Sequence, residues 1–87
     1  MADERYKYSV YVYSKGYDGT LELLNLQSFE KKGLARKFFE QKKSEIQTGA
    51  CRANCAELNK DIYLGDDLFM SSSVNLDHFE RRVDFAV

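Results

Sequence analysis

Hydrophobic and polar residues alternate one by one from Tyr6 to Tyr13. Strict alternation is typical of a β-strand with one face turned towards a core and the other turned away from it. The first face of this strand carries Tyr6, Tyr8, Val10 and Val12, and the second carries Lys7, Ser9, Tyr11 and Tyr13. We expect the first face to pack under the rest of the chain.

A turn and a second strand follow. Gly16-Tyr17-Asp18-Gly19 combines two glycines with an aspartate, and these residue types favour tight turns. The next strand is expected from about Thr20 to Leu26. Its hydrophobic phase slips between Leu23 and Leu24, which predicts either a β-bulge or burial on both sides.

From about Glu30 the spacing changes to the helical period of one, three and four residues. The hydrophobic positions with this spacing are Leu34, Ala35, Phe38, Phe39 and Ile46. Ser28 is the expected N-cap of this amphipathic helix, and the helix should end near Gly49.

The segment from Cys51 to Leu58 fits two interpretations. As a strand, it places Cys51, Ala53 and Cys55 on an inward face, and Asn59-Lys60 then turns the chain into a further strand at 62–64. As a short helix, it stacks the two cysteines one turn apart. The strand is favoured, because another extended segment follows directly.

Gly65-Asp66-Asp67 breaks the chain again; a short extended stretch at 68–70 and a loop at 71–73 are expected after it. Strict alternation returns from Phe79 to Val87 and predicts a closing strand, although a helix over 75–82 stays open as an alternative.

This order of elements predicts an α+β fold. We expect a small antiparallel sheet of four to five strands in β-β-α-β-β order, with one amphipathic helix packed on one face. A single helix covers one face of a sheet only. The other face is therefore left to solvent, to a second copy of the chain or to a partner.

Length and composition change this picture little. The 87 residues suit one domain over 1–87, and they include six Tyr, six Phe and no Pro. The formal net charge is −1, which gives no overall attraction to nucleic acid. The N-terminus lacks an apolar leader, no segment is apolar enough for a membrane span, and two cysteines suit a reducing compartment, so a cytoplasmic location is expected.

Residues that carry chemistry are few. His78 is the single histidine, and Cys51 and Cys55 with His78 offer three metal ligands where a structural zinc site needs four. We expect free thiols, and a bridge or redox pair between the two cysteines is the alternative. Asp66 and Asp67 suit a solvated turn better than acid-base or metal chemistry. We therefore expect no catalytic residue, no metal, no cofactor and no enzymatic activity.

A basic stripe of Lys32, Arg36 and Lys43 follows one side of the expected helix. Such a stripe suits three roles: a solvated face, a contact to nucleic-acid phosphates or a contact to an acidic protein. Nucleic-acid binding through these residues is the alternative function.

The second face of the first strand is the leading candidate for a binding surface. Tyrosine offers a large contact area with a polar tip and is enriched at interfaces, although cross-strand pairing alone would also explain these residues. The expected partner-binding residues are Tyr11, Tyr13, Tyr17, Lys7, Asp18, Asp66 and Asp67.

In its short length, its lack of proline, its tyrosine content and its mixed charge, the chain resembles small phage-encoded inhibitor proteins, among them anti-CRISPR proteins. The resemblance implies a protein that blocks a larger nucleoprotein machine by binding to it. We expect a small protein-binding module of this kind, as a monomer or a homodimer, with another protein or a nucleoprotein complex as its partner.

Overall fold

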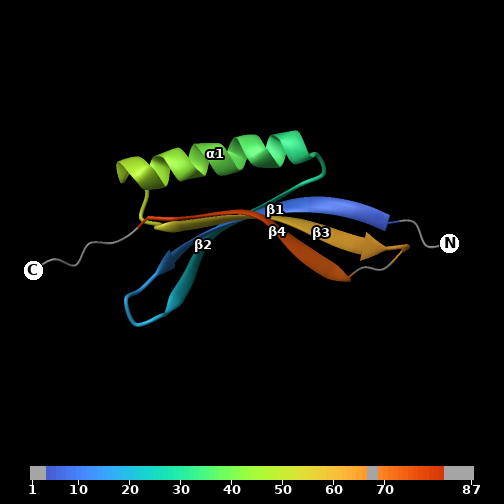
Figure 1. Ribbon diagram of the computed structural model, residues 1–87, viewed down its shortest axis with the longest axis horizontal. Helices are drawn as coiled ribbons and strands as arrows, with labels where there is room; N and C mark the ends of the chain where they lie inside the picture. Colours follow the sequence, from blue (N-terminus) through green and yellow to red (C-terminus); the bar gives the residue numbers. More distant parts are fainter. Residues whose placement is uncertain (1–3, 67–68, 82–87) are drawn as a thin grey trace, which may run out of the picture.

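A computed structural model of the protein describes residues 4–66 and 69–81. Within these residues the chain forms four strands and one helix (Figure 1): β1 (Glu4–Lys15), β2 (Leu21–Phe29), α1 (Lys32–Thr48), β3 (Cys55–Leu64) and β4 (Ser72–Glu80). The strands make one antiparallel sheet in the order β2-β1-β3-β4, so β2 and β4 are its edges. The predicted α+β fold with β-β-α-β-β order is confirmed. No helix in the described part of the chain is long and apolar enough to cross a membrane.

Helix α1 lies across one face of the sheet (Figure 1). It packs through Ala35, Phe39 and Ile46, which are fully buried and follow one another at spacings of four and seven residues. The sheet side of this core includes Val10, Val12 and Leu58. The predicted assignment of Val10 and Val12 to the covered face is therefore confirmed.

The predicted irregularity in the second strand is a β-bulge. Tyr13 pairs with Leu23 and Val12 pairs with Asn25, so Leu24 is the extra residue. The bulge lets Leu23 stay on the uncovered face while Leu24 packs against the core. A second bulge, which the sequence pattern did not reveal, leaves Leu76 as an extra residue in β4.

The predicted N-cap of the helix is wrong, and the predicted end is confirmed. Ser28 lies in β2, because strand pairing with Ser9 continues to that point. The N-cap position is Lys31, which makes no side-chain capping bond. Gly49 ends the helix with a positive φ of 76°, and its N–H donates to the carbonyl oxygen of Ile46 at 3.2 Å.

The turn predicted at Asn59-Lys60 is wrong, because both residues lie inside the continuous strand β3 and pair with β1. Pairing with a twelve-residue neighbour overrides the local turn preference of asparagine. The inward position predicted for Cys55 is confirmed as burial, because this residue is fully buried, but its side chain does not lie beneath the helix. Cys55 is paired with Tyr13, and paired residues of neighbouring strands share a face, so its side chain belongs to the uncovered face.

Three predictions for the last third of the chain also need correction. Ser72 and Ser73 are the first residues of β4 rather than part of a loop, and Phe69 and Met70 precede that strand without forming one. The alternative helix over 75–82 is wrong as far as Glu80, because 75–80 are extended. The closing strand was expected to start at Phe79, but it starts seven residues earlier, at Ser72. Its expected continuation over 82–87 lies outside the described residues.

Candidate functional site

The candidate site is the sheet face opposite α1, which we call the open face. Two rows of paired residues cross it from β2 to β4 at the end nearest the β1–β2 turn. The first row is Leu23, Tyr13, Cys55 and Glu80, and the second is Leu26, Tyr11, Glu57 and His78. The leucines and tyrosines of both rows lie on β2 and β1, and the two carboxylates, Glu57 and Glu80, lie on β3 and β4.

A groove of about 300 Å³ lies over part of these rows; its lining residues are Tyr11, Tyr13, Leu21, Leu23 and Glu57. We call it the open-face groove. Leu21 and Leu23 are 62% and 55% exposed, although both are large and apolar. Isolated exposed leucines are common, but here two of them line one hollow together with two tyrosines.

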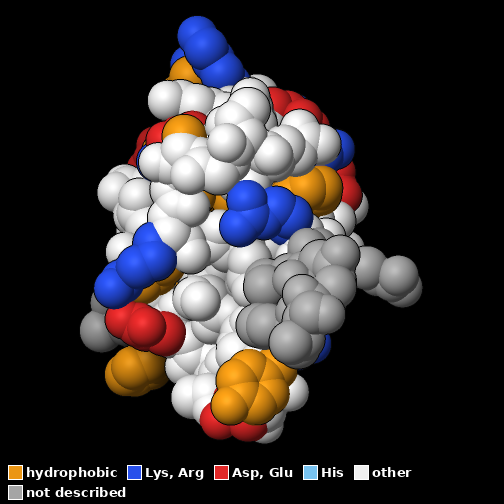
Figure 2. All heavy atoms as spheres, turned by 90° about the vertical axis from the view of Figure 1, so that its left-hand side faces the viewer, with side chains coloured by type: hydrophobic (Ala, Val, Ile, Leu, Met, Phe, Trp, Pro, Cys, Tyr) orange, Lys and Arg blue, Asp and Glu red, His pale blue; other side chains and the backbone are white. Residues whose placement is uncertain are grey.

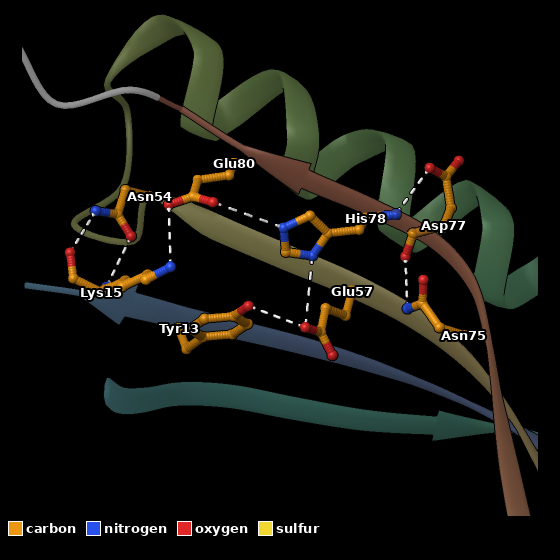
Figure 3. A network of polar contacts seen from close by, with 8 residues as sticks. All are labelled: Tyr13, Lys15, Asn54, Glu57, Asn75, Asp77, His78 and Glu80. Atoms are coloured by element: carbon orange, nitrogen blue, oxygen red, sulfur yellow. Dashed lines mark hydrogen bonds and ion pairs between the residues drawn. The ribbon is translucent and has the colours of Figure 1, made fainter. Parts of the chain in front are cut away.

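A chain of polar contacts borders the groove on the β3 and β4 side (Figure 3). The Tyr13 hydroxyl donates to Glu57 Oε1 at 3.0 Å, and His78 Nδ1 lies 3.4 Å from the same oxygen. His78 Nε2 lies 3.9 Å from Glu80, whose carboxylate is 3.7 Å from Lys15 Nζ. These contacts fix the Tyr13 ring and the Glu57 carboxylate beside the groove.

The environment of the groove favours the protonated form of its phenols. Burial, followed by the hydrogen bond to Glu57, raises the pKa of Tyr13 well above its usual range. Burial also raises the pKa of Tyr11, and the nearby carboxylates of Asp61 and Glu57 raise it further. Both tyrosines therefore offer a hydroxyl group and an uncharged ring at neutral pH.

The opposite half of the open face is polar. Asp61 is buried there, where it accepts hydrogen bonds from the Ser9 hydroxyl and, at 3.1 Å, from the Ser73 hydroxyl. Lys7 lies in this half, with its ammonium group 5.7 Å from the centre of the Tyr63 ring. Because its buried acid is hydrogen-bonded within the protein, this half has the character of an internal polar network.

The structure brings together only some of the predicted partner-binding residues. Tyr11 and Tyr13 line the groove. Tyr17 and Asp18 lie in the β1–β2 turn at the same end of the sheet, and Tyr17 is 87% exposed. Figure 2 faces this end: hydrophobic side chains lie beside acidic ones at its lower edge, whereas most Lys and Arg side chains lie higher, towards the helix.

Another predicted residue, Asp66, is distant from the groove. Asp66 lies in the turn after β3, at the opposite end of the sheet from Asp18. The strand β1 between these ends spans roughly 36 Å at 3.3 Å per residue. Asp67 lies outside the described residues. Asp18 is also engaged locally, because the Thr20 hydroxyl and N–H donate to its carboxylate and thereby lower its pKa.

The basic helix stripe contacts the protein itself. Arg36 Nη1 lies 2.6 Å from Asp77 Oδ2 and 3.7 Å from Glu40 Oε1. The hydrogen bond from Arg36 to Asp77 holds the pKa of Asp77 below its usual range. The Lys43 ammonium group lies 5.5 Å from the centre of the Phe79 ring. Lys32, at the start of α1, is exposed. Two of the three cations are thus already in contact with β4.

Within residues 4–66 and 69–81, no three His, Cys, Asp or Glu side chains are grouped so that they could hold a metal ion. Cys51 and Cys55 are both free thiols in the structure. Burial raises the pKa of Cys55, which is fully enclosed.

Sequence reasoning missed Leu21, Leu23 and Glu57 as site residues. The hydrophobic pattern shows that the two leucines share a face, but it does not tell which face of the sheet that is. Glu57 lies 46 residues from Tyr11 in sequence, and only the register between β1 and β3 places it opposite that tyrosine.

In comparisons with protein-family models, with curated proteins and with solved structures, this chain matches none. The functional argument therefore rests on the open face.

Proposed function

We propose that the protein is a small protein-binding module that docks on another protein through the open-face groove. The observation that supports this most is the exposure of Leu21 and Leu23 in one hollow with Tyr11 and Tyr13. Tyrosine and apolar side chains in a groove that is bordered by polar groups are the usual composition of the centre of an interface.

The partner is a larger nucleoprotein machine, and binding inhibits it. A chain of 87 residues can block such a machine sterically. It then covers a surface that the machine needs for its activity, and it catalyses no reaction itself. This mode of action agrees with the general resemblance to small phage-encoded inhibitors, including anti-CRISPR proteins.

The test is affinity capture from extracts of the native host, with and without nuclease. Three baits are compared: the parent, an open-face variant with Leu21→Ser and Leu23→Ser, and a helix variant with Lys32→Gln, Arg36→Gln and Lys43→Gln. A genuine partner is retained by the parent and the helix variant, is lost by the open-face variant, and loses its activity when the purified parent is added.

Two results argue against the proposal. Equal capture by the parent and the open-face variant removes the groove from the binding surface. If the helix variant alone fails and the captured material is nuclease-sensitive, the chain binds nucleic acid, and its affinity should then fall steeply with salt. A cooperative thermal melt is required of each of the three baits as the control that it is folded.

A further inference from the structure

The open-face groove combines apolar walls with one acidic end. Leu21 and Leu23 form its β2 side, Tyr11 and Tyr13 lie on β1, and Glu57 lies on β3. A ligand group that fits apolar walls followed by a carboxylate has an aliphatic stem and a positively charged tip. Arginine and lysine side chains have this construction, and they often lay their stems on apolar surface.

One oxygen of the Glu57 carboxylate is available to accept a hydrogen bond from a ligand. Both of its contacts, from the Tyr13 hydroxyl and from His78 Nδ1, go to Oε1 (Figure 3). Oε2 accepts no hydrogen bond from the described residues. The Glu57 side chain is 33% exposed, so an incoming group can reach it.

Five other carboxylates among the described residues already have a cation nearby. Lys or Arg groups lie within 4 Å of the side chains of Glu22, Glu40, Glu45, Asp77 and Glu80. Among residues 4–66 and 69–81, no Lys or Arg lies within that distance of Glu57. Glu57 therefore stands at the end of an apolar groove with His78 as its basic neighbour, on Oε1, and with no Lys or Arg of the described residues close by.

We infer that the open-face groove receives an arginine or lysine side chain that projects from the partner protein. The stem lies on Leu21 and Leu23, and the charged tip meets Glu57 Oε2 between the Tyr11 and Tyr13 rings. Burial is the main cause of the raised pKa of Tyr11, and the Asp61 and Glu57 carboxylates raise it further, which agrees with a negative potential at this position. This inference rests on the proposed function of the open face and specifies the residue that the partner supplies.

The experiment is an NMR titration of the ¹⁵N-labelled protein. The probes are the blocked tripeptides acetyl-Leu-Arg-Leu-amide and acetyl-Leu-citrulline-Leu-amide, which differ in charge and hardly in shape. We expect shifts centred on the groove residues and about fivefold tighter binding of the arginine peptide, the upper range for a solvent-exposed ion pair. This preference should shrink as salt is added.

Two variants make the titration specific. Glu57→Gln retains an acceptor for the Tyr13 hydroxyl but removes the charge, so the two peptides should bind it equally. Glu80→Gln removes a neighbouring carboxylate that already has Lys15 at 3.7 Å, and it should keep most of the preference for arginine. Well-dispersed spectra confirm that both variants are folded.

Equal binding of the two peptides at the groove overturns the cationic anchor and leaves the proposed protein-binding function standing. Shifts that lie elsewhere, or no shifts at millimolar peptide, also overturn the inference. A concentration-dependent dimer in sedimentation velocity, with the groove shielded in the absence of peptide, contradicts it as well, because a second copy of the chain then occupies the groove. The capture experiment described above tests the proposed function separately, since it uses no peptide.

Discussion

The covered and the open face belong to the same four strands, but they differ in what their side chains contact. On the covered face, Val10, Val12 and Leu58 are buried against Phe39 and Ile46 of the helix. On the open face, large apolar side chains remain accessible beside polar ones. Residues that alternate along one strand therefore have two different environments, and neighbouring positions should respond differently to the same substitution.

The largest expected effect concerns the covered face. Phe39→Ala removes a fully buried ring and should lower the free energy of unfolding by about 3–5 kcal/mol, which is most of the stability of a small domain. Urea denaturation followed by circular dichroism measures this loss.

The matched control is Leu34→Ala on the same helix, where the side chain is 54% exposed. We expect a change within about 0.5 kcal/mol there. Equal losses for the two variants would mean that the helix does not pack on the sheet through Phe39.

A smaller effect is expected where the helix meets β4. Arg36→Gln removes the partner of Asp77 and should cost about 1 kcal/mol at neutral pH, since the pair is partly exposed. Because Arg36 lowers the pKa of Asp77 in the folded state, this stabilisation is present above the ordinary aspartate pKa of about 3.9.

The stabilisation is lost as the pH falls through the lowered pKa of Asp77. The free energies of unfolding of the parent and of Arg36→Gln should therefore converge in acid, as a series of melts between neutral pH and pH 2.5 will show. A difference that stays constant over this range would assign the effect of Arg36 to packing on Phe39 rather than to charge.

The smallest expected effect concerns the rates at which the two cysteines are alkylated, and it does not involve the free energy of unfolding. Cys55 is enclosed and its thiol pKa is raised by burial, whereas Cys51 is partly exposed and lines a second hollow. Iodoacetamide should alkylate Cys51 first and Cys55 at least about tenfold more slowly, since the thiolate is the reactive form and the buried site must open. Peptide mapping by mass spectrometry against time gives both rates. Faster reaction of Cys55 would show that the open face around Tyr13 is looser than the structure indicates.

Much of the fold could be predicted because its main signals are local. Alternation defined the faces of β1, the helical spacing defined α1, and the phase slip at Leu23 and Leu24 located a bulge. The errors arose where long-range pairing prevailed. Asn59 and Lys60 are good turn residues in isolation, but pairing with β1 keeps them extended.

The candidate site could be predicted only in part. Tyr11 and Tyr13 were predicted on the uncovered face because they belong to one strand with a clear pattern. The groove also needs Leu23 from β2 and Glu57 from β3, and these residues meet only through the register of three strands. The register between neighbouring strands decides which residues meet, and the pattern of a single strand does not contain this register.

The most direct measurement compares Val10→Ala with Tyr11→Ala, two neighbours on β1 that lie on opposite faces. For each variant, the free energy of unfolding and the dissociation constant for the captured partner are measured together. Val10→Ala should lose about 2 kcal/mol of stability and, where it is folded, bind normally. Tyr11→Ala should lose about 1 kcal/mol or less and bind at least about tenfold more weakly. A Tyr11→Ala variant that unfolds like Val10→Ala, or that binds as tightly as the parent, would contradict the assignment of the open face as the interaction surface.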